Sequence, residues 1–220
     1  MSPRLLKIAN MVRHSTLVDI GTDHAHLPIY LAQGGRVCNV LATDIALEPL
    51  ERGRQNAAYA DVLHIVDFKQ GAGLEGVTPL KYETCTISGM GGEMIAGILQ
   101  NSPDVAKGFK QLVLSPQRSV PKLRRFLHDN GFSINNEEIV EDNGKFYNIL
   151  DCSPNPQEPY DDAGYEFGQI LLEGRHPLLG SLIRYDMKKY ENINMDALPG
   201  ERRAELEKYI KLCLEVLEWL

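Results

Sequence analysis

The segment from Thr16 to Pro28 constrains the fold of this chain more than any other. Thr16–Ile20 is a short apolar run followed by a glycine, the pattern of a buried parallel strand. Pro28 suits the first turn of a helix, where its missing N–H group costs no hydrogen bond. A strand, a glycine turn and a helix start are typical of a doubly wound α/β fold, which binds ligands at this turn. An ordinary strand–helix turn with solvated acids is the competing interpretation.

This turn carries acids where a dinucleotide site carries glycines. Asp19 lies in the strand and Asp23 lies just before the helix, with Gly21 as the one glycine between them. The G-x-G-x-x-G fingerprint lets backbone N–H groups approach a pyrophosphate, whereas carboxylates repel it. Carboxylates accept hydrogen bonds from an amine or from hydroxyl groups. S-adenosylmethionine has no phosphate and carries an ammonium, a sulfonium and a ribose diol. The turn therefore favours a methyltransferase over a nicotinamide dehydrogenase.

The rest of the first 152 residues continues the alternation of strands and helices. We expect further strands at 37–44, 62–68, 83–87, 111–115, 132–141 and 145–152, and helices at 3–12, 25–33, 47–60, 93–99 and 120–130. The last two strands flank Asp142-Asn143-Gly144, a strong tight-hairpin pattern. Five βα units followed by a hairpin predict a mostly parallel seven-stranded sheet with one late antiparallel strand. This is the class I methyltransferase (Rossmann-like) fold.

The composition changes after this sheet. We expect residues 1–152 to form an S-adenosylmethionine-binding catalytic domain, and residues 153–220 to form a linker and a C-terminal α-helical hairpin. Residues 153–162 hold three prolines and three acids, which is typical of a linker. Residues 177–220 are interpreted as an antiparallel, coiled-coil-like hairpin. Its apolar seam of heptad type is Leu206, Ile210, Cys213, Leu217 and Leu220.

Composition narrows the class of protein. The net charge of −7 does not favour nucleic-acid binding. No apolar run is long enough for a membrane span, and the first residues have no signal-peptide pattern. The four cysteines lie far apart, so we expect buried, reduced thiols and no zinc site in a cytoplasmic protein. Two runs of basic residues contain no acid, and each could contact phosphates or form a solvated helix face. The first consists of Arg4, Lys7 and Arg13. The second consists of Arg118, Lys122, Arg124 and Arg125.

Other candidate ligand residues lie at the ends of the expected strands. Asp44 ends the second strand, where a carboxylate would bind two ribose hydroxyls, and a helix cap is its alternative role. Gly71-Ala72-Gly73 follows the third strand and would border an adenine. Ser88-Gly-Met-Gly-Gly92 follows the fourth, where glycines let backbone approach ligands or simply make a tight turn.

Four motifs together resemble the bacterial tRNA adenine N1-methyltransferases that modify position 22. They are Asp19-Ile-Gly-Thr-Asp-His-Ala-His-Leu-Pro28, Ile87-Ser-Gly-Met-Gly-Gly92, Leu112-Val-Leu-Ser-Pro116 with Leu123-Arg124, and Glu141-Asp-Asn-Gly-Lys-Phe-Tyr147. The resemblance implies S-adenosylmethionine as methyl donor and tRNA as substrate. The cofactor-binding residues that it implies are Asp19, Gly21, Asp23, Asp44, Ile45, Gly71, Ala72, Gly73, Ser88, Gly89, Met90 and Gly91.

Two departures from the family pattern concern the expected site. The family usually has an acid or amide where this chain has Ala72, so a side-chain hydrogen bond to the cofactor adenine is missing. The family's Gln-Pro-Asn is Ser115-Pro116-Gln117 here, in a loop that could touch the target base.

Asp23 is the candidate catalytic residue. A carboxylate there could accept the N–H of the target adenine's amine, whose acidity rises as N1 is methylated. Binding the methionine ammonium is its alternative role. The tRNA contacts are assigned to the basic run at Arg118–Arg125, and base stacking to Tyr30, Phe146 or Tyr147, each of which could instead be a core residue. Two rival functions remain, a small-molecule methyltransferase and a non-catalytic cofactor-binding protein; no protein partner is evident.

Overall fold

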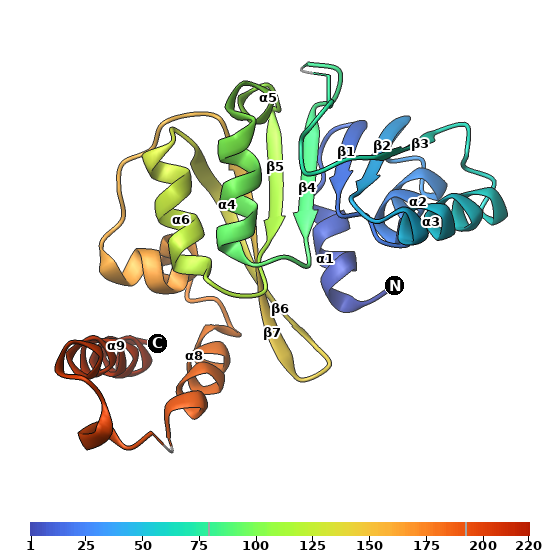
Figure 1. The fold of residues 1–220 in the computed structure, drawn as a ribbon. Helices are drawn as coiled ribbons and strands as arrows, with labels where there is room; N and C mark the ends of the chain where they lie inside the picture. Colours follow the sequence, from blue (N-terminus) through green and yellow to red (C-terminus); the bar gives the residue numbers. More distant parts are fainter. Residues whose placement is uncertain (79, 192) are drawn as a thin grey trace. The chain divides into compact units, whose positions relative to one another are not determined.

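A seven-stranded β-sheet runs through residues 1–159 in the order β3-β2-β1-β4-β5-β7-β6 (Figure 1). This computed structural model describes residues 1–78, 80–191 and 193–220. The strands are β1 (Thr16–Ile20), β2 (Asn39–Asp44), β3 (Val66–Gln70), β4 (Thr84–Ser88), β5 (Gln111–Ser115), β6 (Ser133–Asp142) and β7 (Lys145–Ser153). Neighbours from β3 to β5 are parallel, and β7 is antiparallel to β5 and β6. The predicted fold with one antiparallel strand is confirmed.

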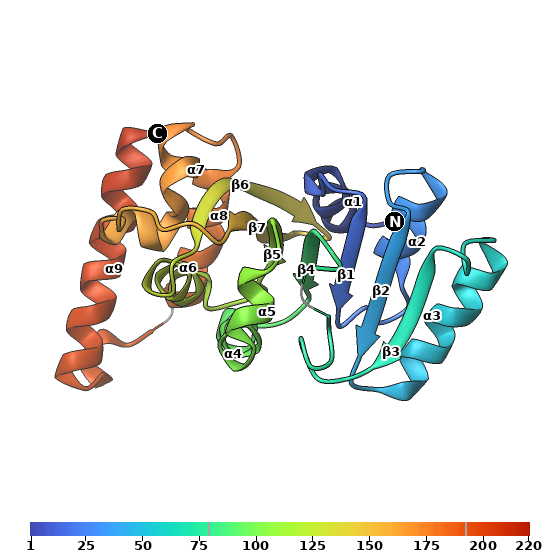
Figure 2. The same ribbon diagram turned by 90° about the horizontal axis from the view of Figure 1, so that it is seen from above.

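Helices cover this sheet. They are α1 (Pro3–Met11), α2 (His26–Gln33), α3 (Leu47–Tyr59), α4 (Gly92–Asn101), α5 (Pro103–Lys107) and α6 (Val120–Asp129). The helix α2 packs against both α1 and α3 (Figure 2), and all three share one core with the strands, in which Ile8, Leu31 and Ala57 are buried beside Leu17 and Val40. The helices α4, α5 and α6 form a second group, drawn in green and yellow-green to the left of β4 in Figure 1. Burial of one apolar stripe per helix thus holds the strand ends in fixed positions.

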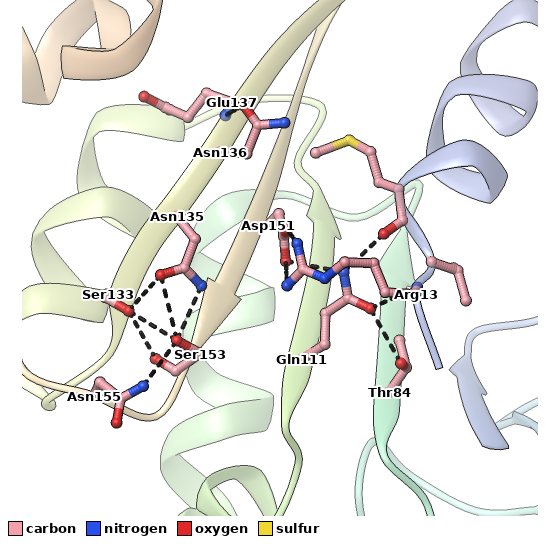
Figure 3. A network of polar contacts seen from close by, with 12 residues as sticks. Arg13, Thr84, Gln111, Ser133, Asn135, Asn136, Glu137, Asp151, Ser153 and Asn155 are labelled. Atoms are coloured by element: carbon pink, nitrogen blue, oxygen red, sulfur yellow. Dashed lines mark hydrogen bonds and ion pairs between the residues drawn. The ribbon is translucent and has the colours of Figure 1, made fainter. Parts of the chain in front are cut away.

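A buried polar network attaches the C-terminal end of α1 to the sheet (Figure 3). The amide nitrogen of Gln111 donates to the carbonyl oxygen of Met11 (2.8 Å) and to the carboxylate of Asp151 (3.0 Å). Its amide oxygen accepts hydrogen bonds from the backbone N–H of Arg13 (3.0 Å) and from the hydroxyl of Thr84 (3.2 Å). The Arg13 guanidinium also pairs with Asp151. Because every polar group of the Gln111 side chain has partners, the network fixes α1 without leaving a buried amide unpaired.

Within residues 1–159, two elements differ most from the sequence-based expectation. The third strand was predicted at 62–68 but starts at Val66, because the amides of Ile65 and Val66 both donate to the carbonyl of Val62 and close a turn. The short helix α5 was not predicted. Pro103 occupies its first turn and Gly108 follows its end, so its sequence does carry the usual boundary residues.

Residues 160–220 form a second, smaller unit. It contains the π-helical turn Gly164–Gly168, α7 (Gln169–Glu173), α8 (Leu179–Met187), 3₁₀ turns at Lys188–Tyr190 and Met195–Ala197, and α9 (Gly200–Trp219). The structure does not support the predicted coiled coil. Of the proposed seam, Cys213 is buried and Leu220 is exposed, and the other buried residue of α9, Val216, lies outside the seam. Tyr209 of α9 packs against both Phe167 and Tyr190, so α9 joins a small cluster rather than one long partner helix.

The cysteines are unpaired thiols, as expected, but they are not all buried. Cys85, Cys152 and Cys213 are buried, and burial raises the pKa of each thiol, which disfavours the reactive thiolate. Cys38, which lies just before β2, is exposed. Among the described residues, no group of His, Cys, Asp and Glu has the arrangement of a metal site, and no helix combines the length and apolarity needed to cross a bilayer.

Candidate functional site

The loops that follow β1, β2, β4 and β5 are joined by backbone hydrogen bonds at the carboxyl edge of the sheet. The amide of Thr22 donates to the carbonyl of Thr43 (2.9 Å), and that of Gln117 donates to the carbonyl of Met90 (2.8 Å). The Gly71 amide, at the end of β3, donates to the carbonyl of Asp44 (3.0 Å). These bonds hold separate loops around a single cavity of about 670 Å³, a volume suited to a small ligand.

The cavity brings together most of the residues that the sequence singled out. Those that line it are Asp19, Gly21, Asp23, Asp44, Ile45, Gly71, Ala72, Gly73, Ser88, Gly89 and Met90. Gly91 is not in its lining, because it caps α4 and faces the side chain of Arg118. Sequence reasoning did not single out Leu5, Thr22, His26, Met94 or Ile98, and it considered Arg4 only as part of a basic run.

Asp19 is the buried acid of the cavity, with a relative exposure of 4%. Its carboxylate accepts hydrogen bonds from the hydroxyls of Thr22 (2.8 Å) and Thr86 (2.5 Å). Burial raises the pKa of the Asp19 carboxyl to about 6, although both hydroxyl hydrogen bonds act in the opposite direction. A cationic ligand in the cavity would favour the ionised carboxylate. Asp19 therefore provides a negative charge that is expensive to bury without such a ligand.

Asp44 organises the turn after β2. One carboxylate oxygen accepts from the amide of Asp23 (3.1 Å) and the other from the amide of Ala46 (2.9 Å). The N-cap of α3 is Ala46 rather than Asp44, so a simple cap does not account for this carboxylate. The Asp44 carboxylate lines the cavity and accepts hydrogen bonds from the loops that follow β1 and β2, and these bonds orient its oxygens for a ligand.

Asp23 differs from the other two acids in its exposure. Its side chain is 67% exposed and lies 3.6 Å from the imidazole of His24. Its backbone has a φ of +52°, which is unusual for a residue with a side chain and is often found at functional sites. The position at the open side of the cavity is compatible with either role considered for Asp23.

Two glycines are required where side chains fold over the loops. A Cβ on Gly21 would lie 2.3 Å from Cε of Met90, and its φ is +68°. A Cβ on Gly73 would lie 2.9 Å from the side chain of Ile98, at a φ of +56°. Since most side chains disfavour this backbone conformation, both positions favour glycine independently of the ligand.

The predicted tRNA-contacting run at 118–125 divides in the structure. Arg124 is 1% exposed and its Nε lies 2.7 Å from Oε1 of Glu137, which is equally buried. The prediction that Arg124 contacts tRNA is therefore wrong, because its guanidinium is enclosed in the core. Arg118, Lys122 and Arg125 are exposed, and Lys122 pairs with Glu93 at the surface. In the N-terminal run, Lys7 and Arg13 pair with Glu138 and Asp151.

Comparison with known proteins gives consistent results. Residues 1–150 match a family model described as "Methyltransferase domain". The chain is 28% identical to the tRNA (adenine(22)-N(1))-methyltransferase of Bacillus subtilis over 99% of this chain and 97% of that protein. It is 31% identical to a putative tRNA methyltransferase of Mycoplasma pneumoniae, over 68% of this chain and 70% of that one.

Solved structures extend the similarity to both units. A putative tRNA (m1A22) methyltransferase of Streptococcus pneumoniae, in complex with S-adenosyl-L-methionine, has a TM-score of 0.89 at 30% identity, with 99% of each chain covered. A protein of the NADB-Rossmann superfamily from Streptococcus agalactiae has a TM-score of 0.91 at 32% identity, covering 99% of this chain and 97% of that one.

Proposed function

Because this chain belongs to the methyltransferase-domain family, and within it to the tRNA (adenine-22-N1)-methyltransferases, we propose that it methylates N1 of an adenine in tRNA, at position 22. The observation that carries the proposal is similarity along nearly the whole chain, including the C-terminal unit, to a tRNA (adenine(22)-N(1))-methyltransferase and to a putative tRNA (m1A22) methyltransferase. A tRNA substrate would place the protein in the cytoplasm, as its sequence predicts.

The cavity is suited to S-adenosylmethionine. Its acids match a ligand with an ammonium, a sulfonium and a diol, and they oppose a pyrophosphate. We assign the ribose diol to Asp44 and the adenine to the loop Gly71–Gly73, where Ala72 offers backbone groups and a methyl. Ser88, Gly89 and Met90 border the methionine end, together with Asp19. When bound, S-adenosylmethionine supplies an electrophilic methyl group.

The residues of the chain need do little acid–base chemistry, since N1 of adenine is itself a nucleophile. Their main contribution is to hold the two reactants in line, which can supply most of the acceleration. We assign to Asp23 the hydrogen bond from the exocyclic amine, because its exposed carboxylate lies at the open side of the cavity. Gln117 also lines the cavity and offers an amide to the target base.

Replacing Asp23 with Asn separates its two candidate roles. The variant keeps the shape and removes the charge. If Asp23 stabilises the methylated base, turnover falls strongly while the affinity for S-adenosylmethionine stays unchanged. If the affinity falls instead, Asp23 binds the methionine ammonium and the catalytic assignment is wrong.

Transfer of labelled methyl from S-adenosylmethionine to tRNA that lacks the modification tests the function. Nucleoside analysis should show N1-methyladenosine, and mapping should place it at position 22. Transfer to no tRNA, with the cofactor bound normally, would refute the proposed substrate and favour a small-molecule acceptor. Failure to bind S-adenosylmethionine would refute the enzyme assignment itself.

We assign the tRNA backbone to the exposed basic residues Arg118, Lys122 and Arg125. Phosphate contacts make affinity fall steeply with salt, so their joint replacement by Ala should weaken tRNA binding and flatten its salt dependence. Lys110, which pairs with Glu83 at the surface before β5, provides a control for the loss of a positive charge outside this surface. If the salt dependence of tRNA binding is unchanged in the variant, this surface does not contact the tRNA backbone.

A further inference from the structure

The side-chain amide of Gln117 is a polar group of the cavity lining that the fold itself does not use. Gln117 is exposed, and within the described part of the chain its side chain makes no hydrogen bond. Ser115, two residues earlier, is fully buried, and its hydroxyl donates to the carbonyl of Asn148 (3.2 Å). Of the two polar side chains in Ser115-Pro116-Gln117, only that of Gln117 can therefore reach a ligand.

Gln117 is held in place through its backbone. The strands β4 and β5 pair in parallel along their whole length, and hydrogen bonds continue between the loops that follow them. The amide of Gln117 donates to the carbonyl of Met90 (2.8 Å), and the amide of Gly92 donates to the carbonyl of Arg118 (2.8 Å). Because these bonds fix the backbone, only the side chain of Gln117 must be ordered when a ligand binds, which favours a binding role.

The cavity is open beside this amide, above Gly89. A Cβ added to Gly89 would have Nε2 of Gln117, at 3.9 Å, as its one neighbour within 4 Å among the described residues, the adjacent residues aside. The strand β4 lies between β1 and β5, so the loop with Gly89 has Asp23, which follows β1, on one side and Gln117 on the other. A planar base over Gly89 would thus meet the amide of Gln117 with one edge.

Given the proposed function, on which this inference depends, we propose that Gln117 binds the N6/N7 edge of the target adenine and so selects adenine. On this edge adenine presents an amine that donates and a ring nitrogen that accepts, and a side-chain amide can accept from the first while it donates to the second. Guanine presents two acceptors there, which would leave the amide oxygen facing an acceptor. N1 lies on the other side of the amine, so this contact leaves N1 free and leaves the second N–H of the amine for Asp23.

A tRNA with 7-deazaadenosine at the target position tests this assignment, because a C–H group there replaces the N7 acceptor. The preference in kcat/KM for the tRNA with adenosine should be roughly 5- to 100-fold larger in the wild-type protein than in Gln117→Ala, as expected when one hydrogen bond of a buried contact is left unmade. Any change in the reactivity of N1 is common to both proteins and cancels in this comparison. Gln117→Glu keeps the shape and an acceptor but has no donor, so it should lose the preference as well. In calorimetric titration, both variants should bind S-adenosylmethionine as the wild-type protein does.

Gln100→Ala is the matched control, because it removes an exposed amide from α4 outside the cavity lining. Its preference between the two tRNAs should equal that of the wild-type protein. The assignment is overturned if Gln117→Ala keeps the wild-type preference, a result that leaves the proposed function intact because methyl still reaches tRNA. It is also overturned if Gln117→Ala loses affinity for S-adenosylmethionine, which would indicate that the amide contacts the cofactor. Absence of transfer from the wild-type protein to either tRNA would instead refute the proposed function, and this inference with it.

Discussion

Removing Arg124 should damage the stability of residues 1–159 rather than tRNA binding. Its guanidinium donates to Glu137 (2.7 Å) and to the amide oxygen of Asn148 (3.3 Å), and both Arg124 and Glu137 have side chains that are 1% exposed. Arg124→Ala would leave Glu137 as a buried charge without its main partner. Breaking a buried pair from one side typically costs about 3–5 kcal/mol, a large part of the roughly 5–15 kcal/mol of a whole domain. Lys122→Ala, on the same helix, removes a partner of an exposed ion pair and should leave the stability almost unchanged.

Urea unfolding followed by circular dichroism measures the difference. Trp219 is the only tryptophan of the chain and belongs to the unit 160–220, so its fluorescence reports that unit separately. Arg124→Ala should shift the dichroism transition to lower urea and leave the tryptophan transition in place. A second variant, Arg124→Met with Glu137→Leu, removes both charges and should recover most of the lost stability. A wild-type midpoint in Arg124→Ala, together with weakened tRNA binding, would refute the buried-pair interpretation.

Two further predictions concern the cavity and its loops. Gly92→Ala would place a Cβ 2.5 Å from the backbone oxygen of Ser119, so it should lower the free energy of unfolding by about 1–3 kcal/mol and weaken cofactor binding. In the same helix, the Cβ of Gly97→Ala meets no atom within 4 Å, so this variant should raise the free energy of unfolding by about 0.5–1 kcal/mol. Urea midpoints and cofactor titrations of both variants measure these effects, and equal effects of the two variants would contradict the prediction. Burial raises the pKa of the Asp19 carboxyl in the folded protein to about 6, from an ordinary value of 3.8. The protonated carboxyl therefore favours folding, fully so below pH 3.8. This stabilisation, roughly 3 kcal/mol, is lost as the pH rises through 6. The wild-type protein should therefore lose stability relative to Asp19→Asn between pH 4 and 7, and a pH-independent difference in urea midpoint would show that the pKa of Asp19 is not raised.

Sequence alone predicts the order of elements well because apolar runs and glycine turns are local features. Thr16–Ile20 and Gln111–Ser115 were placed with their observed bounds. The third strand was placed too early, since Val62 and Ile65 are apolar but belong to a turn whose hydrogen bonds do not show in composition. The coiled coil failed for a related reason. A heptad seam in α9 predicts one long partner, whereas α8 spans only nine residues.

The acids of the cavity could be predicted because each lies directly at or beside a strand end, where a parallel sheet gathers its ligands. The close packing of Met90 over Gly21 could not be predicted, because it depends on how the loops after β1 and β4 meet in space. The exposure of Asp23 and the burial of Asp19 likewise follow from neighbours distant in the sequence. Thr86, which bonds Asp19, lies on β4.

Two arginines, Arg4 and Arg124, lie at helical spacing from buried apolar residues. Arg124 lies on the buried face of α6 with Leu127, and the half-buried Val120 precedes it at helical spacing, so the periodicity opposes a phosphate contact. Arg4 is aligned in the same way with Ile8 and Met11, both buried in α1. An arginine on an apolar helical face must find an anion or leave a charge unpaired. Glu137 meets that need for Arg124. Arg4 lies half-buried in the first turn of α1, and its guanidinium stacks on the ring of Tyr147, so an aromatic face takes the place of an anion there.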